Sequence, residues 1–309
     1  MERRGRNWIV TIAIVTLVAL LAACGTAPGG NGGDNGDGNG HVTTGVRDIG
    51  FVVVDETTDD AANAQAGGNG VFLRFDDDVP DAFFDAAWSE GVGTCEVLSA
   101  SAIDPGDPID ALPIPTLPDD LGFAFLDAGD SIAVRTAGDA YLALDRHQDS
   151  IGELAIIAYA TLDAVAGPLP ADLTLSVPGG GYPSVASAAF PEAPPFELTE
   201  PAEPGGFGSV GIDTTFTWSG ATSDATTIVT IVLASADFST FVTCTAADIG
   251  TFAFPAATVT ELEGAFTGSV LTSGRTVLRV HAVGDARLIL AINRTRSYPV
   301  SMVPFDGLR

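Results

Sequence analysis

Four aspartates between residues 76 and 81 form the densest group of side chains in this chain that could do chemistry. They are Asp76, Asp77, Asp78 and Asp81, and they follow a β-rich run at Val71–Phe75. Carboxylate oxygens at the end of a strand are ligands that Ca²⁺ prefers. The pattern indicates a candidate calcium site, while a solvated acidic loop without metal explains the same residues more simply. Calcium is the one cofactor that the sequence suggests.

Catalytic side chains are not predicted anywhere else in the chain. A nucleophilic triad needs a histidine beside its nucleophile, but His41, His147 and His281 are scattered, in a Gly-rich stretch, an expected loop and an expected strand. The segment 206–211, Gly-Phe-Gly-Ser-Val-Gly, has the glycine spacing of a dinucleotide-binding turn but precedes a strand instead of a helix. Zinc motifs are not found either. We therefore predict no catalytic residues and a non-enzymatic protein.

Residues 1–23 have the organisation of an export signal. Three arginines within the first six residues precede an apolar stretch at Trp8–Ala23. This stretch is shorter than the roughly 20 residues that a membrane span needs, and its length is typical of a secretory signal. It ends in the sequence Leu21-Ala22-Ala23-Cys24.

This Leu-Ala-Ala-Cys sequence resembles the lipobox of bacterial lipoproteins. The resemblance covers only the first two dozen residues. It implies cleavage before Cys24 and lipid attachment to its sulfur, so that the mature chain is anchored to a membrane without spanning it. Gly25, where an Asp would imply retention at the inner membrane, implies the outer membrane instead. The alternatives are an ordinary uncleaved anchor helix, or an export signal in which Cys24 occurs by accident.

Residues 24–46 follow as a flexible linker of Gly, Asn and Asp, because they contain no apolar pattern that would offset the entropy of ordering them. The whole chain has 309 residues and a net charge of −27. A strongly acidic chain does not suit nucleic acid, which needs a basic surface. We therefore expect partners among envelope or extracellular proteins or glycans, and the membrane itself through the lipid.

Beyond the linker the chain is predicted to be all-β. Runs rich in Val, Ile, Leu, Thr and Phe alternate with clusters of Gly, Pro, Asp and Asn, which is typical of β-sandwiches. The runs lie at Phe51–Val54, Val71–Phe75, Glu153–Tyr159, Leu173–Val177, Thr214–Trp218 and Thr227–Leu233. Only Asp81–Ser89 is expected to form a helical turn or two.

The Pro-rich segment around Pro194 and Pro195 predicts a domain boundary. The prediction is of two tandem immunoglobulin-like β-sandwiches, an acidic first domain over 47–195 and a second domain over 196–309. A sequence repeat supports this division, because Ser131–Leu144 matches Val277–Leu290 without a gap at a constant offset of 146 positions. Thr94-Cys95 is likewise repeated as Thr243-Cys244.

Each copy of the repeat is predicted to be a hairpin. In the second copy, a three-residue loop starting at Gly284 puts Val280 opposite Leu290 and leaves Arg279 and His281 on the wetter face. A two-residue loop would instead pair His281 with Leu288. In the first copy the same register puts Val134 opposite Leu144 and leaves Arg135 outside.

Cys95 and Cys244 are the only other cysteines. Export favours a disulfide between them, but equivalent positions of two neighbouring sandwiches normally lie too far apart for the bond. We therefore predict two unpaired, buried cysteines, with a disulfide as the alternative.

These observations predict a lipid-anchored protein of the cell envelope, with a structural or binding role carried by its β-sandwich domains. Whether it faces the periplasm or the outside stays open. A calcium-dependent hydrolase that uses the acidic loops of the first domain, and an inert charged spacer, are the alternatives.

Overall fold

The computed structural model describes residues 46–59, 62–79, 92–99, 122–151, 154–200, 208–210, 214–235, 240–255 and 269–302. These residues form strands joined by turns and loops, which confirms the all-β prediction. Within them, no helix has the length and apolar character that crossing a membrane requires. The signal sequence, Cys24, the linker up to residue 45 and the helical turn expected at Asp81–Ser89 lie outside the described residues.

Eighteen strands are described, and each of the six apolar runs named above overlaps one of them, which confirms those strands. The first nine are β1 (Val46–Thr58), β2 (Ala64–Val79), β3 (Thr94–Ser99), β4 (Phe123–Phe125), β5 (Ser131–Thr136), β6 (Asp139–Ile151), β7 (Leu154–Ala160), β8 (Val165–Ala166) and β9 (Leu173–Val177). The others are β10 (Val185–Ala189), β11 (Leu198–Glu200), β12 (Gly208–Val210), β13 (Thr215–Trp218), β14 (Thr227–Ser235), β15 (Thr240–Ala247), β16 (Thr251–Ala253), β17 (Ser269–Val283) and β18 (Ala286–Met302).

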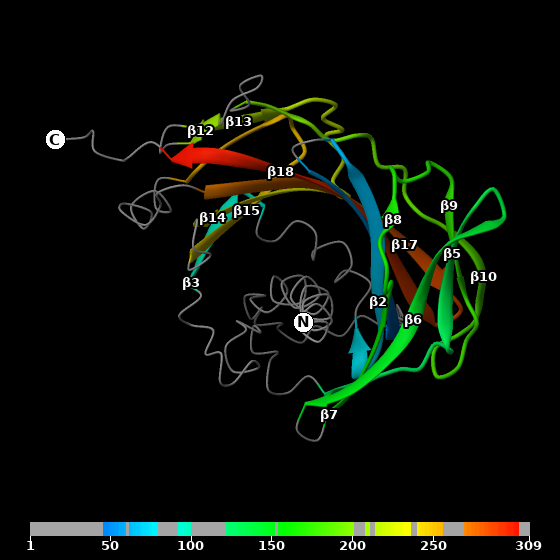
Figure 1. Ribbon diagram of the computed structural model, residues 1–309. Coiled ribbons are helices and arrows are strands. Elements are labelled where there is room, and N and C mark those ends of the chain that lie inside the picture. The colour runs from blue at the N-terminus through cyan, green and yellow to red at the C-terminus, as the bar shows by residue number, and fades with distance from the viewer. Residues whose placement is uncertain are drawn as a thin grey trace, which may run out of the picture.

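Most strands belong to one large sheet, which follows an arc in Figure 1. Its order is β10-β9-β5-β6-β7-β2-β1-β18-β17-β14-β15-β3, with β4 and β8 added beside β2 and β12 beside β18. A small second sheet has the order β11-β13-β16. Several neighbours in the large sheet, such as β1 and β18 or β3 and β15, come from distant parts of the sequence, so its formation depends on long-range pairing.

The pairing of β1 with β18 joins the two ends of the described chain. These strands run parallel over ten residue pairs, from Ile49 opposite Arg287 to Thr58 opposite Arg296. The pairing places strands from both sides of the expected boundary at 195 and 196 in one sheet. Two separate tandem sandwiches of the immunoglobulin-like kind are therefore not confirmed.

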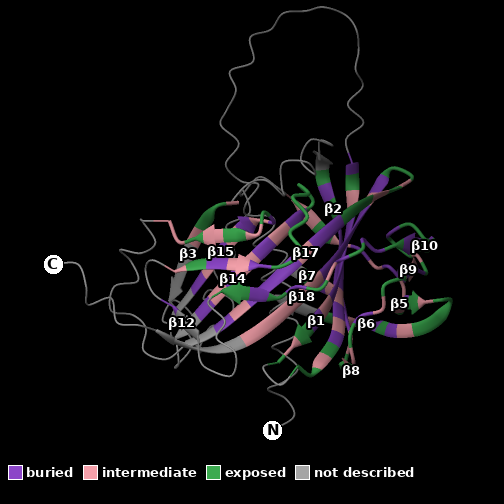
Figure 2. Cartoon of the chain, turned by 90° about the horizontal axis from the view of Figure 1, so that it is seen from above, coloured by how far each residue is buried: buried purple, intermediate pink, exposed green. Residues whose placement is uncertain are grey.

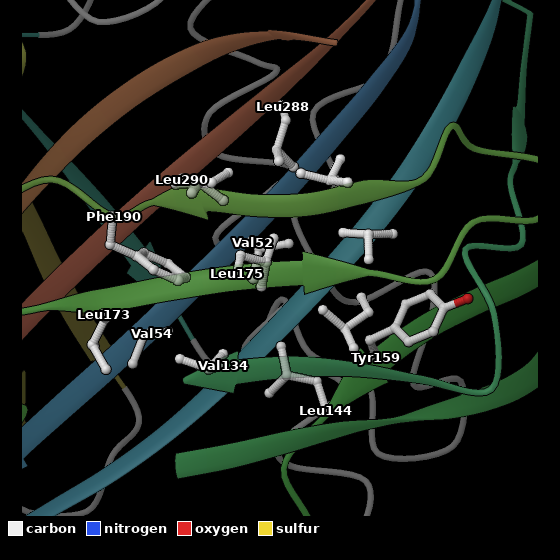
Figure 3. Packing of buried hydrophobic residues seen from close by; sticks show 14 of the residues in the cluster. Val52, Val54, Val134, Leu144, Tyr159, Leu173, Leu175, Phe190, Leu288 and Leu290 are labelled. Atoms are coloured by element: carbon white, nitrogen blue, oxygen red, sulfur yellow. The ribbon is translucent and has the colours of Figure 1, made fainter. Parts of the chain in front are cut away.

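Two apolar clusters cover one face of the large sheet, which we call the packed face. In the first cluster, β5, β6, β9 and β10, which form one end of the same large sheet, pack against β1, β2, β17 and β18. Figure 3 shows this packing, with Val52 and Val54 of β1 near Leu173 and Leu175 of β9. In the second cluster, the small sheet packs over β14, β15 and β17. Buried positions run along these central strands in Figure 2.

A third cluster lies on the opposite face. It is formed by side chains that alternate with those of the packed face, such as Phe51 and Val53 of β1 and Ile289 and Ala291 of β18. Strand residues point alternately to the two faces of a sheet. Because both faces are apolar here, Leu288–Ile292 forms a continuous buried run instead of an alternating one.

The register predicted for the β17–β18 hairpin is wrong. Val280 lies opposite Ile289, and His281 lies opposite Leu288, around a two-residue turn that begins at Gly284. The prediction rejected this register because it assumed that only one face of the hairpin is buried. Instead Leu288 is buried, whereas His281 lies at the margin of the packed face and contacts the backbone oxygen of Ala189 in β10.

The register predicted for the first copy is wrong as well. Val134 pairs with Leu142, and Ile132 pairs with Leu144. The turn there contains Ala137 and Gly138, both with positive φ, and the register shifts by one residue next to Val134. Arg135 is exposed, as predicted. The repeated sequence thus adopts two different registers, because the position of each turn depends on local backbone geometry.

The prediction of unpaired cysteines is wrong too, because Cys95 and Cys244 form a disulfide. The two repeat-equivalent strands β3 and β15 are neighbours in one sheet, where Cys95 lies directly opposite Cys244 with 4.0 Å between the Cα atoms. Separate sandwiches would keep the two cysteines apart, whereas a shared sheet brings them together. The bond fixes β3, the last strand in the order of the large sheet, to β15.

We expect replacement of both cysteines by alanine to lower the free energy of unfolding by about 3–5 kcal/mol, because the bond closes a loop between residues 149 positions apart. Urea unfolding of the full-length protein measures this difference. Adding a reductant to the double variant serves as the control and should change nothing. Two titratable thiols from Cys95 and Cys244 in the unreduced, denatured wild-type protein would contradict the assignment.

Candidate binding face

The predicted calcium ligands are not assembled into a site within the described residues. Asp76 lies exposed in β2, beside Gly122. Asp77 and Asp78 also belong to β2, but their side chains lie outside the described part, as does the whole of Asp81. Across the described ranges, no group of three or more His, Cys, Asp or Glu side chains is arranged to hold a metal ion. The calcium site stays a prediction.

The two described histidines do not form a catalytic set. His147, expected in a loop, lies in β6, and His281 lies in β17, where it contacts a backbone oxygen. Arg279, two residues before His281, donates a hydrogen bond to the backbone oxygen of Phe190. These two side chains therefore reach from the hairpin to the edge of the sheet at β10, and we assign them a structural role.

Charged side chains that form ion pairs lie on the packed face, between the first and second apolar clusters. Arg275 of β17 is fully buried and forms an ion pair with Asp248, with 3.1 Å from Nε to Oδ2. The indole of Trp218 donates a hydrogen bond of 2.7 Å to the same carboxylate, and the backbone and hydroxyl of Thr222 donate two more. Burial raises the pKa of Asp248, but these bonds and the Arg275 charge outweigh burial and hold the pKa below its ordinary value.

A second ion pair lies beside the first. Arg294 of β18 is directly opposite Arg275, and its guanidinium donates to both carboxylate oxygens of Glu56, at 2.8 and 2.7 Å. The backbone N–H of Leu169 donates to Glu56 as well, at 2.6 Å. Arg275 also donates to the backbone oxygens of Pro194 and Pro195. On the packed face, Arg275 and Arg294 are thus each paired with an acid of the protein.

The opposite face carries a row of threonines, and we call it the threonine face. The row follows the register of seven neighbouring strands from β3 to β2, and each residue lies opposite the next. Its members, in order, are Thr94, Thr245, Thr230, Gly274, Thr295, Thr57 and Gln65. Apart from the buried Gly274, all are exposed or half-buried.

A second row of polar residues on this face is connected by hydrogen bonds. Asp55 of β1 accepts one from the amide of Asn69, at 3.3 Å, and one from the amide of Asn293, at 3.0 Å. The hydroxyl of Thr276 in turn donates to the amide oxygen of Asn293, at 3.2 Å. Four adjacent strands, β2, β1, β18 and β17, therefore contribute to one polar chain with Asp55 at its centre.

Burial raises the pKa of Asp55 to about 6, against the lowering effect of the hydrogen bond from Asn293. Asp55 is half-buried and lies beside the apolar cluster that contains Val53 and Ala291. The face as a whole offers carboxylate, amide and hydroxyl groups. These groups suit the recognition of a ligand through hydrogen bonds.

This face was not predicted from the sequence, although a signal for it exists. Asn293, Thr295 and Ser297 alternate with Arg294 and Arg296, so one side of β18 is uncharged and polar and the other is basic. An alternation of two polar classes has no apolar member, so a search for hydrophobic periodicity does not detect it.

Comparisons with known proteins identify no relative. No family model matches the chain, and no curated protein matches it. Among solved structures, the Fcho1 Mu homology domain of Danio rerio with bound Eps15 peptide is 8% identical, with coverage of 82% of this chain and 96% of that chain. The TM-score of 0.21 is too low for this likeness to carry an argument.

Replacement of Arg275 by methionine should lower the free energy of unfolding by about 3 kcal/mol, because it leaves the Asp248 carboxylate buried without its counter-ion. Urea unfolding followed by tryptophan fluorescence measures the loss. Arg135→Met is the matched control, since Arg135 is exposed, and it should change stability by no more than about 0.5 kcal/mol. Equal stabilities of the two variants would show that the buried pair is not needed.

Asp55→Asn should change how stability depends on pH. Because the pKa of Asp55 in the folded protein is above the ordinary 3.8, the folded state binds the proton more tightly. The ionised carboxylate therefore costs stability above pH 6, and this cost disappears as the pH falls from 6 towards 4. Relative to wild type, the variant should gain up to about 3 kcal/mol between pH 4 and pH 7.

Unfolding measurements at a series of pH values test this difference. Asp172→Asn is the control with the opposite sign, because hydrogen bonds from Thr136 and Ala137 lower the pKa of Asp172. Its carboxylate stabilises the folded state above pH 4, so that variant should lose stability, relative to wild type, as the pH rises. Parallel pH curves for wild type and Asp55→Asn would contradict the raised pKa.

Proposed function

We propose that this chain is a lipid-anchored protein of the cell envelope with a non-enzymatic binding role. The observation that carries the proposal is the disulfide between Cys95 and Cys244, because such bonds persist in oxidising compartments outside the cytoplasm. It agrees with the export signal and the lipobox at Leu21–Cys24. Lipid on Cys24 and the linker up to residue 46 then hold the folded part near the membrane, with the outer membrane favoured by Gly25.

The binding role is supported by the contrast between the two faces of the large sheet. The packed face is occupied by two layers of strands, and its buried charges are all paired within the protein. The threonine face presents exposed or half-buried polar groups in register. In this proposal the two covering layers take the place of the two separate sandwiches expected from sequence, and the opposite face of the large sheet presents the binding surface.

Mass spectrometry of the protein isolated from membranes tests the anchor. The wild-type N-terminal tryptic peptide should begin at Cys24, end at Arg47 and carry the additional mass of a diacylglyceryl group. Cys24→Ala should abolish this modification, whereas the neighbouring Thr26→Ala should keep it. A chain that still begins at Met1, or an unmodified Cys24, would contradict the proposal.

A further inference from the structure

We infer that the threonine face binds a neutral glycan with an extended backbone, centred on Asp55 and the amides of Asn69 and Asn293. The inference rests on the proposed function, because it names the class of ligand for the binding role given there. Three features of the described residues carry it, namely unused hydrogen-bonding capacity, the distribution of charge and the spacing of the rows.

The polar groups of this face keep capacity for a ligand after their mutual hydrogen bonds are counted. An ionised carboxylate has about four acceptor sites, and the bonds from Asn69 and Asn293 give each oxygen of Asp55 one donor. The hydroxyl of Thr295 donates to the hydroxyl of Thr57 and to the backbone oxygen of Glu56, both at 3.2 Å, so its lone pairs remain for a ligand. Thr272 and Ser297 share one bond of 3.1 Å. Each hydroxyl is both a donor and an acceptor. Sugar hydroxyls have the same double character, so they match such a surface.

Charge favours a neutral ligand over an anionic one. The arginines that alternate with the polar residues in β17 and β18 point to the packed face, where Arg275 pairs with Asp248 and Arg294 with Glu56. The central group of the threonine face is the carboxylate of Asp55, and the chain has a net charge of −27. Anionic polymers are therefore repelled, whereas the hydroxyls of a neutral glycan are not.

The spacing of the rows suits an extended chain that lies across the strands. Neighbouring strands are about 4.7–4.9 Å apart, which is close to the repeat per residue of an extended β-linked glycan. Successive sugars then meet successive positions of the row, such as Thr230, Gly274, Thr295 and Thr57. Gly274 has no side chain that would project from the centre of the row, and a Cβ there would overlap the side chain of Thr295.

Isothermal titration of the full-length protein with cellohexaose and chitohexaose tests the inference, with hexagalacturonate as the anionic comparison. We expect the wild type to bind at least one of the neutral hexaoses and to bind hexagalacturonate at least tenfold more weakly. The triple variant Thr57→Val, Thr230→Val and Thr295→Val keeps β-branched side chains and removes three hydroxyls. It should bind at least tenfold more weakly than wild type.

The matched control is Thr199→Val with Thr217→Val, which removes two hydrogen-bonded hydroxyls from the small sheet. This variant should bind as the wild type does. The inference is overturned if the wild type binds neither neutral hexaose. That result is also expected if another part of the chain or a protein covers this face. Equal binding by the triple variant, or stronger binding of hexagalacturonate, would overturn the inference too. The mass of the Cys24 peptide is measured separately, so a lipidated protein that binds no glycan refutes this inference alone.

Discussion

The architecture depends on two arginines that lie side by side inside it. Arg275 and Arg294 are directly opposite each other on adjacent strands, an arrangement that is unfavourable for like charges. Each is neutralised by its own acid, Asp248 or Glu56. An unpaired buried charge would cost several kcal/mol, so the loop that carries Asp248 and the strand that carries Glu56 are both fixed in place. A one-residue slip of β18 would move Arg294 to the other face and break the arrangement.

These charges also explain why the covering layers meet where they do. Arg275 donates to the backbone oxygens of Pro194 and Pro195, in the segment that leads from β10 of the first layer to β11 of the second. The guanidinium lies over the ring of Phe196, at 5.4 Å from its centroid. The connection is therefore held at the seam between the two apolar clusters. Both layers consequently occupy the same face of the sheet.

With the packed face occupied, the chemistry of the molecule is divided between two surfaces. Arg275, Arg294 and their acids stabilise one side, whereas hydroxyls, amides and the carboxylate of Asp55 occupy the polar part of the other. This division is possible within β18 because successive side chains of a strand point to opposite faces of the sheet. The disulfide adds β3 to the same sheet and so extends the threonine row to Thr94. A binding role for an exported protein is consistent with this division.

The sequence by itself determined the secondary structure class, because runs such as Val71–Phe75 and Thr227–Leu233 favour strands wherever they pack. It also predicts an export signal up to Cys24, from a pattern that is local. Hairpin registers were not determined. Leu288–Ile292 is buried on both faces, so it shows no alternation of apolar and polar residues from which a register could be inferred. The disulfide and the pairing of Asp55 with Asn293, 238 positions apart, depend on which strands become neighbours. Only the tertiary structure decides that, because strand pairing joins distant segments through backbone hydrogen bonds that have no sequence signature.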